Sequence, residues 1–307
     1  MNKEINPFDR LRVNTELGRS IKTIPIDDNN YPNLLKEIKN PPKVLYYLGS
    51  LPRAESRDFA IVGTRRYSSY GKQVALEFAN DLADAGLTIV SGLAPGIDTF
   101  AHQAVVDKNK RTIAVLGTGL DEKSIYPKTN LDLAEKIIKT GGCLISEYPP
   151  GTRGTKFTFP QRNRIISGLS LGTLVIEAKE RSGALITAKF AFSQRRKVFA
   201  IPGPIYSSNS RGPHILIKNG AKLAENAEDI LKELNLPYLK PTNQKIEGGN
   251  PEENFILEIL KEESLDIDKI IEEAGLPAAS IIRTLAILEI KGKVKNLGNN
   301  IYATSNR

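Results

Sequence analysis

The chain has 307 residues and a mass of 33.8 kDa, which is enough for one large core and a smaller second domain. A single cysteine, Cys143, excludes a disulfide framework, and with only two histidines we expect neither a metal site nor a cofactor. A mean hydropathy of -0.27, the lack of an apolar run of about 18 residues and a polar N-terminus predict a cytoplasmic protein without a membrane span.

The net charge of +8 favours an acidic partner such as nucleic acid. Its distribution along the chain is uneven. Residues 250–307 hold seven Lys and Arg against ten Asp and Glu, a net charge of −3. The first 249 residues therefore carry a net charge of +11, and we expect the basic surface to lie there.

We expect residues 1–20 to form an N-terminal tail and residues 21–234 to form one α/β domain, which begins with a helix over 31–38 and a strand over 44–48 at its edge. Short apolar runs then predict strands over 59–62, 87–90, 112–116, 143–146, 173–176 and 198–201. Helical patterns cover 71–85, 97–108, 130–140, 160–168, 183–194 and 227–234. Apolar strands that alternate with helices are typical of a doubly wound, mostly parallel sheet with helices on both faces.

Residues 235–252 are rich in Pro, Asn, Gly and Lys without periodicity, which predicts a linker. Residues 253–307 then show three helical patterns, over 253–263, 266–274 and 278–291, followed by a hairpin. This order predicts a small C-terminal winged-helix domain. Its third helix carries only Arg283 before its end, so we expect a protein-contact or regulatory role rather than reading of duplex DNA.

An acid-free basic segment lies between Glu147 and Glu177. Its cations are Arg153, Lys156, Arg162 and Arg164. Pro160 suits the first turn of a helix, which would place Arg162 and Arg164 near the positive end of the helix dipole, where cations are unfavourable. This arrangement predicts a site for an anion such as phosphate. The alternative interpretation is that the two arginines form ion pairs with distant carboxylates.

Glycines follow several predicted strands, where ligands bind in open parallel sheets. They are Gly63, Gly92, Gly117 and Gly183. Each could be an ordinary turn glycine, but their shared location favours backbone N–H groups that bind phosphate oxygens. A dinucleotide site is disfavoured, because Gly117-Thr118-Gly119 lacks the third glycine of that motif.

Carboxylates at strand ends leave a hydrolytic alternative open. Asp98 could be a general base, but it stands at a predicted helix start, where an N-cap role is expected, with His102 as its neighbour on the helix face. Glu147 and Glu177 form the one carboxylate pair that could support hydrolysis, and no water-activating partner is visible. We therefore assign no catalytic residue.

Aromatic residues are interleaved with the cations of these loops. They are Tyr67, Tyr70, Tyr126, Tyr148, Phe157 and Phe159. This combination suits single-stranded nucleic acid, whose bases stack on rings while phosphates follow a basic groove. We expect Phe157 to lie in the core, and for Phe159 both positions stay open.

Several motifs together resemble the DNA-processing protein A family, also called DprA or Smf, over about residues 25–235. They are Gly63-Thr-Arg65, Ser91-Gly-Leu-Ala-x-Gly-Ile-Asp98, Thr112-Ile-Ala-Val-Leu-Gly-x-Gly-Leu-Asp121 with Tyr126, Pro127 and Asn130, Ser146-Glu-Tyr-Pro-Pro-Gly151, Phe159-Pro-x-Arg-Asn-Arg-Ile-Ile-x-Gly-Leu169, Glu177-Ala-x-x-Arg-Ser-Gly-x-Leu-Ile-Thr187 and Ile201-Pro-Gly203. The resemblance implies an extended Rossmann-like domain that binds single-stranded DNA, protects it and loads the RecA recombinase during natural transformation and homologous recombination. It implies no enzymatic activity.

The resemblance also implies which residues contact DNA. Arg65 and Lys156 match the principal contact positions, and Arg162, Asn163 and Arg164 match the lining of the same pocket. The expected DNA-binding set is Gly63, Thr64, Arg65, Ser91, Gly92, Lys156, Phe159, Arg162, Asn163, Arg164, Ser182 and Gly183.

The family resemblance further implies a homodimer formed through residues 212–222, and the apolar character of that segment supports it. The expected interface residues are His214, Ile215, Leu216, Ile217 and Leu223. Pro213 departs from the small polar residue that is common in the family. Many members begin with a small helical SAM-like domain, and we expect it to be missing or vestigial here.

The residues give weaker support to two alternative functions. The first is a nucleotide-processing hydrolase with a Rossmann-like fold, because Gly172, Thr173 and Glu177 distantly resemble the Gly-Thr-x-x-Glu turn of such enzymes, although their spacing is two residues too long. The second is a regulatory adaptor that works through the winged helix, which the basic character of the larger domain disfavours.

Overall fold

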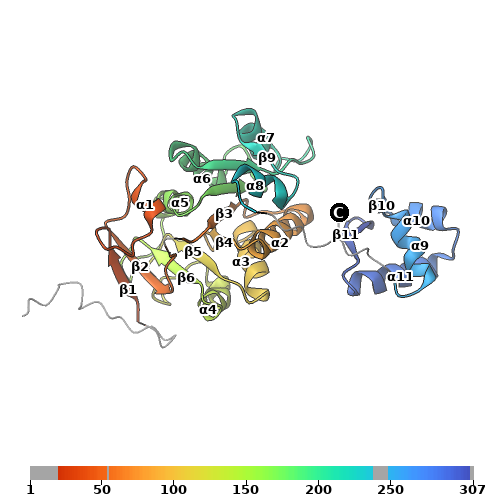
Figure 1. Cartoon of the computed structure of the whole chain (residues 1–307), viewed down its shortest axis with the longest axis horizontal. Helices are drawn as coiled ribbons and strands as arrows, with labels where there is room; N and C mark the ends of the chain where they lie inside the picture. Colours follow the sequence, from red (N-terminus) through yellow and green to blue (C-terminus); the bar gives the residue numbers. More distant parts are fainter. Residues whose placement is uncertain (1–19, 54, 238–247, 305–307) are drawn as a thin grey trace, which may run out of the picture. The chain divides into compact units, whose positions relative to one another are not determined.

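The computed structural model describes residues 20–53, 55–237 and 248–304. The chain divides into two units, Met1–Tyr238 and Leu239–Arg307, each with its own core (Figure 1). The predicted N-terminal tail and most of the predicted linker lie outside the described residues. Among the described residues, no helix has the length and apolar character needed to cross a membrane.

A nine-stranded sheet forms the centre of the first unit, in the order β1-β2-β6-β5-β4-β3-β7-β8-β9. The strands are β1 (Lys22–Pro25), β2 (Val44–Gly49), β3 (Asp58–Val62), β4 (Thr88–Ser91), β5 (Thr112–Leu116), β6 (Cys143–Ser146), β7 (Gly172–Val175), β8 (Lys197–Ala200) and β9 (Lys222–Leu223). From β6 to β9 every pairing is parallel, while β1 and β2 add an antiparallel edge. The six predicted parallel strands are confirmed, and β1 and β9 were not predicted.

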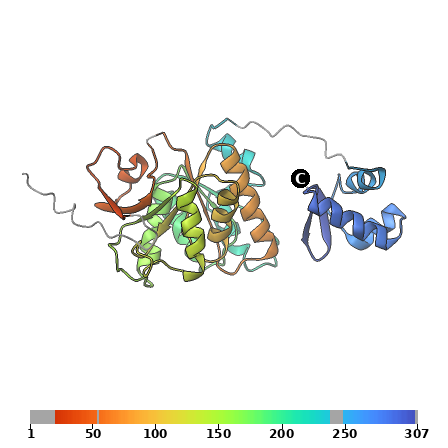
Figure 2. The same cartoon turned by 90° about the horizontal axis from the view of Figure 1, so that it is seen from below.

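Helices cover both faces of this sheet (Figures 1 and 2). They are α1 (Asn33–Lys36), α2 (Ser69–Asp84), α3 (Ile97–Asp107), α4 (Leu131–Lys139, after a 3-10 turn at Lys128–Asn130), α5 (Thr158–Gly168), α6 (Gly183–Ser193), α7 (Arg211–Lys218) and α8 (Ala227–Glu233). One face packs against α1, α5, α6 and α7, and the other against α2, α3, α4 and α8. The predicted fold class is confirmed, although α1 is shorter than expected and α7 was not predicted as a helix.

The alternation of side chains along the central strands explains why both faces need helices. In β3, Ala60 and Val62 join the core on the α5 and α6 side, while Phe59 and Ile61 join the core on the α2 and α3 side. Successive residues of a strand point to opposite faces, so a strand that is apolar at every position must be covered twice.

The order of the strands produces a topological switch point beside β3. From β3 the chain moves outward through β4, β5 and β6, and then returns to place β7 on the other side of β3. The connections after β3 and β7 therefore leave the sheet in opposite directions. A crevice forms at the carboxyl ends of two such strands, and this is where doubly wound sheets bind ligands.

The second unit is a winged helix with its own small core. Its elements are α9 (Pro251–Ile259), β10 (Leu265–Asp266), α10 (Ile267–Ala274), α11 (Ala278–Ile290), β11 (Val294–Gly298) and β12 (Ile301–Thr304). The strands form an antiparallel sheet in the order β10-β12-β11. Three helices and a hairpin were predicted for this part of the chain, and β10 adds a third strand.

Candidate nucleic-acid interface

A pocket of about 370 Å³ opens at the carboxyl ends of β3 and β7, where the switch point lies. Eight of the twelve residues predicted to bind DNA line it: Gly63, Arg65, Lys156, Phe159, Arg162, Asn163, Ser182 and Gly183. They come from three separate parts of the chain. Thr64, Ser91, Gly92 and Arg164, the other predicted residues, are not part of the lining.

Two cations of the pocket are available to a ligand. Arg65 and Lys156 are exposed, and neither has an acidic partner among the described residues. The Arg65 guanidinium carbon lies 5.9 Å from the centroid of the Phe159 ring, and Lys156 Nζ lies 5.2 Å from that of Phe157. A contact with a neutral ring leaves the positive charge without a counter-charge, so both side chains can meet an incoming phosphate.

Arg162 differs from these two cations, because it is only 4% exposed and its guanidinium group donates hydrogen bonds within the protein. Its Nη1 donates to Gly92 O at 2.7 Å and to Val115 O, and its Nε donates to Asn163 Oδ1 at 3.2 Å. Burial lowers the pKa of Arg162 to about 10, so it is still charged at neutral pH. Arg162 thus supplies positive charge to the pocket but few free donors.

Gly92 and Asp98 explain how a charged arginine fits beneath the pocket. The Gly92 amide donates to Asp98 Oδ2 at 3.1 Å. A Cβ at Gly92 would lie 2.6 Å from Arg162 Nη2 and 2.7 Å from Asp98 Oδ2, so only glycine fits between them. Burial raises the pKa of Asp98, and the charge of Arg162 opposes that effect.

The prediction that Asp98 caps a helix is wrong. The N-cap of α3 is Gly96, which has φ of 90° and makes no side-chain cap. The Asp98 side chain turns back to the Gly92 amide instead. His102 is buried, and its Nδ1 lies 2.8 Å from Thr112 Oγ1. Burial lowers the pKa of His102 to about 3, so its ring is neutral, and the buried ring does not face a ligand.

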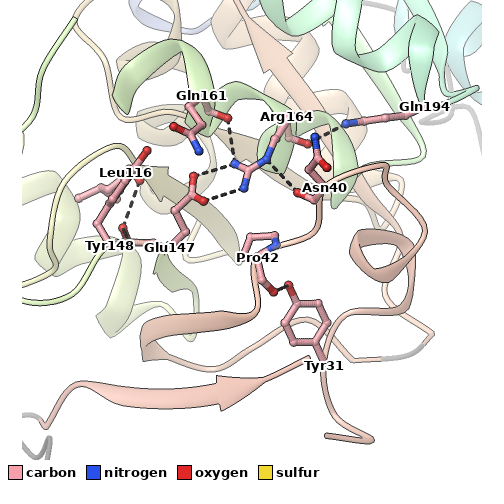
Figure 3. A network of polar contacts seen from close by, with 10 residues as sticks. Tyr31, Asn40, Pro42, Leu116, Glu147, Tyr148, Gln161, Arg164 and Gln194 are labelled. Atoms are coloured by element: carbon pink, nitrogen blue, oxygen red, sulfur yellow. Dashed lines mark hydrogen bonds and ion pairs between the residues drawn. The ribbon is translucent and has the colours of Figure 1, made fainter. Parts of the chain in front are cut away.

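Arg164 anchors the edge of the domain (Figure 3). Its Nη1 and Nη2 donate to the two carboxylate oxygens of Glu147 at 2.7 and 2.6 Å, and its Nε donates to Asn40 O at 3.0 Å. Both side chains of the ion pair are about nine-tenths buried, at 11% and 12% exposed. For Arg164, the alternative of an ion pair with a distant carboxylate is therefore the one observed.

The prediction that Arg162 and Arg164 lie at the positive end of the helix dipole is also wrong. Helix α5 begins at Thr158, two residues before Pro160, so Arg162 and Arg164 lie beyond the first turn. The reason is local: the Thr155 amide donates to Thr158 Oγ1 at 2.9 Å, and the Thr158 amide donates to Thr155 Oγ1 at 3.2 Å. These reciprocal bonds start the helix earlier than the proline does.

The aromatic residues near the pocket are only partly as expected. Phe157 is 71% exposed, so its predicted place in the core is wrong. It is the N-cap residue of α5 and precedes the first turn of that helix. Phe159 is half-buried in the pocket wall, with the ring of Tyr126 5.6 Å away between centroids.

Glu177 and Asn209 tie three loops together near the pocket. The buried Glu177 carboxylate accepts from Ser68 Oγ at 2.6 Å, from the Ser68 amide at 3.0 Å and from Asn209 Nδ2 at 3.3 Å. Asn209 Nδ2 also donates to Arg66 O at 2.9 Å. Since Glu147 pairs with Arg164, the two carboxylates have separate structural partners and do not form a catalytic pair.

The remaining predicted residues hold backbone around the pocket. Ser91 Oγ donates to Ile61 O at 2.6 Å, and Thr64 Oγ1 accepts from the Arg66 amide at 3.1 Å. Ser182 caps α6 by accepting from the Ala184 amide at 3.3 Å. The N-terminus of α6, at Ser182 and Gly183, thus faces the pocket, where its dipole favours an anion.

Sequence reasoning missed one strained position behind the pocket. Leu93 is buried and has φ of 58°, a conformation that bulky side chains rarely adopt. Its carbonyl accepts from Asn130 Nδ2 at 2.9 Å, which also donates to Thr99 Oγ1. Asn130 therefore holds the turn that brings Ala94 into the pocket lining. The lining also includes Pro160, Ile166 and Thr187, which no chemical signal in the sequence marks as pocket residues.

The predicted dimer surface is only partly exposed. Ile215 is 39% exposed and Leu223 is 45% exposed, whereas Leu216 is 5% exposed and belongs to the core. Helix α7 packs on the sheet through Leu216, so this residue is not available to a second chain. His214 Nε2 lies 3.0 Å from Gly203 O, and Ile217 is partly buried.

The chain is similar to proteins of one family over most of its length. Residues 22–235 match the family described as DNA recombination-mediator protein A, and residues 240–300 match the DprA winged helix domain. Protein Smf of Escherichia coli is 41% identical over 280 residues, which are 88% of this chain and 74% of that protein. DNA processing protein DprA of Bacillus subtilis is 45% identical over 73% of this chain and 75% of its own length.

Solved structures give the same result. DNA processing protein A of Streptococcus pneumoniae has a TM-score of 0.65 and 43% identity, covering 71% of this chain and 75% of that one. The protein of the same name from Helicobacter pylori, described for its single-stranded DNA binding mode, has a TM-score of 0.61 and 30% identity, covering 70% of this chain and 95% of that one.

Proposed function

The chain belongs to the DNA recombination-mediator protein A family, and from this membership we propose that it binds single-stranded DNA, protects it and loads a RecA-type recombinase onto it. Its DNA-binding role would then be that of a scaffold, without catalysis. We place it in the cytoplasm, where incoming single strands meet the recombinase during natural transformation.

The observation that carries this proposal is the pocket at the switch point. Eight predicted DNA-binding residues converge there from segments far apart in the sequence. Two exposed cations, Arg65 and Lys156, face it without acidic partners among the described residues. The N-terminus of α6 adds a third element that favours negative charge.

The geometry supports binding through phosphates rather than through base edges. Arg65 and Lys156 are positive groups on exposed loops, and the rings beside them accept any base. A duplex hides its bases, so stacking on Phe157 or Phe159 is possible only for a single strand. We therefore expect little sequence preference and a strong preference for single strands over duplex.

A gel-shift comparison of a single-stranded oligonucleotide with the matching blunt duplex, at two salt concentrations, tests the proposal. The single strand should bind more tightly, and the log–log salt slope should correspond to a few phosphate contacts of about −0.7 each. Equal or tighter binding of the duplex would refute a single-strand function. Nucleoside monophosphates incubated with the protein should remain intact.

Recombinase loading needs a separate test. We expect the protein to raise the rate at which RecA assembles on strands already covered by a single-strand-binding protein. The matched control is Lys156→Ala, which should lose this stimulation together with DNA binding. A protein that binds single strands normally but leaves RecA assembly unchanged would restrict the function to strand protection.

We also propose a homodimer formed by the surface of α7 and β9. Exposed apolar side chains at Ile215 and Leu223 lie on this edge of the sheet. Ile215→Asp should yield a folded monomer that binds long strands more weakly, because one particle then carries one pocket instead of two. Sedimentation measures the change, and a wild-type monomer at micromolar concentration would contradict it.

A further inference from the structure

A second cluster of aromatic and basic side chains lies beside the pocket and is not part of its lining. Tyr67, two residues beyond Arg65, is 46% exposed. Its ring meets that of Phe100 edge to face, with centroids 4.6 Å apart and an interplanar angle of 87°. Lys72 Nζ lies 5.4 Å from the centroid of the Phe100 ring.

Backbone contacts fix this cluster against the loop that carries Arg65. The amide of Ile97, at the start of α3, donates to Thr64 O at 3.3 Å. A Cβ at Gly96 would lie 2.4 Å from that same carbonyl and 2.8 Å from Arg65 Cα, so the two loops touch directly. Phe100 therefore holds the Tyr67 ring at a fixed place next to Arg65.

The charge around the cluster suits a nucleic-acid backbone. Arg66 and Lys72 are exposed, and neither forms an ion pair within the described part of the chain. A tyrosine that only covered Phe100 would need no such surroundings. A tyrosine that is 46% exposed, is held by an edge-to-face contact and lies near two cations without ion pairs matches the stacking platforms of proteins that bind single strands.

We propose that Tyr67 is a base-stacking platform for the part of a single strand that leaves the pocket past Arg65, with Arg66 and Lys72 neutralising the adjoining phosphates. This inference rests on the proposed function. A strand then runs from the rings of Phe157 and Phe159, across Arg65, to the ring of Tyr67. The protein thus binds a longer stretch of strand than the pocket alone can hold.

Strand length separates this platform from the pocket. Tyr67→Ala should weaken binding of an oligonucleotide of about 16 nucleotides roughly tenfold and leave one of about 4 nucleotides unchanged. Tyr67→Phe keeps the ring and should bind as the wild type does. Phe255→Ala, an aromatic with the same 46% exposure in the winged helix, is the matched control and should have no effect.

A fluorescence measurement gives a second, independent readout. The chain contains no tryptophan, so Tyr67→Trp introduces a single reporter. Stacking of a base should quench its emission when the longer oligonucleotide is added, while Phe255→Trp should not respond. Quenching also decides the question if Tyr67→Ala fails to fold.

The outcomes distinguish failure of the inference from failure of the proposed function. A wild type that binds no single-stranded DNA would refute both. If the wild type binds and Lys156→Ala weakens binding, but Tyr67→Ala equals the wild type at both lengths or the Tyr67→Trp emission is unchanged, the platform is refuted and the pocket stands.

Discussion

The cations of the pocket and two lysines of the winged helix differ in whether an acidic side chain pairs with them. In the winged helix, Lys291 pairs with the buried Glu253 at 2.6 Å and Lys261 pairs with Glu258 at 2.8 Å. In the larger unit, Arg65 and Lys156 stand at a strand-end pocket without acidic partners among the residues described. A cation that is already paired gives little to a phosphate, so the availability of the charge matters more than its number.

The third helix of the winged helix, α11, also differs from the pocket in its exposed side chains. In DNA-reading winged helices this helix carries the contacts to the duplex. Here Ile282 and Ile290 of α11 are 53% and 87% exposed. Arg283 is the one cation in the sequence of this helix. The surface that would meet DNA is therefore apolar, and we expect the larger unit to account for strand binding.

The largest expected effect concerns the ion pair that joins the edge of the larger unit. Arg164→Ala leaves the nearly buried Glu147 carboxylate without its partner. Loss of a fully buried pair would cost about 3 kcal/mol, and because this pair is slightly exposed we expect a destabilisation of about 2 kcal/mol. Denaturant unfolding should show the loss in the transition of the larger unit and leave that of the winged helix unchanged.

Arg211→Ala is the control for that experiment. Arg211 and Glu180 form an ion pair at 3.3 Å with exposed fractions of 63% and 55%, and such pairs contribute between 0 and about 1 kcal/mol. Equal stability losses in the two variants would mean that burial of the Arg164 pair has no energetic consequence.

Next in size is the loss of a free cation from the pocket. Arg65→Ala and Lys156→Ala should each weaken single-strand binding about tenfold, or about 1.4 kcal/mol, and each should reduce the log–log salt slope by about 0.7. Both residues are in loops, so thermal unfolding should be unchanged. Lys269→Ala, on an exposed position of α10, should bind as the wild type does. Wild-type affinity in both pocket variants would place the strand elsewhere.

A smaller effect is expected for a buried carboxylate at the opposite end of the sheet. Burial raises the pKa of Asp58 from 3.8 to about 6, against the hydrogen bond from Ser56 Oγ at 2.5 Å. The stabilisation from the protonated form is complete below pH 3.8 and is lost as the pH rises through 6. Asp58→Asn keeps an acceptor for Ser56 and should stabilise the larger unit at pH 8, where the wild type has lost the stabilisation from the protonated form.

The measurement for Asp58→Asn is thermal unfolding at both ends of that pH range. The variant and the wild type should have equal stability near pH 4, because Asp58 is then largely protonated in the folded protein. A stability difference that does not change with pH would show that titration of Asp58 is not its cause.

The smallest effect is expected from removal of the winged helix. Truncation at about residue 248 should leave single-strand affinity unchanged or raise it less than about twofold, because we expect an acidic domain on the predicted linker to compete only weakly for the pocket. Matched binding curves of the full-length and truncated proteins measure this. A tenfold drop, about 1.4 kcal/mol, would assign DNA contacts to the winged helix.

The sequence predicted the strands and helices of the sheet well, because the central strands are short, mostly apolar runs that alternate with helical patterns. The positions of Arg65 and Lys156 also followed from the sequence. What it could not supply is strand order, since the place of β7 beside β3 depends on packing over more than 100 residues of separation.

The sequence also could not predict which partners its charged side chains contact. Arg162 and Arg164 look alike in sequence, yet Arg162 is held by Gly92 O and Val115 O, while Arg164 pairs with Glu147. Both outcomes depend on which loops meet beneath α5. The left-handed conformation of Leu93 is equally hidden, because it arises from the bond between its carbonyl and Asn130.

The side chain of Asn209 connects the segment before α7 to the loop that carries Arg65. It lies two residues before α7, and it donates both to Glu177 and to the carbonyl of Arg66 beside Arg65. Any displacement of α7 that moves Asn209 also changes the bonds that hold this loop. The proposed pairing of two chains at α7 and the proposed capture of a strand are therefore expected to be thermodynamically linked, each changing the equilibrium constant of the other by the same factor.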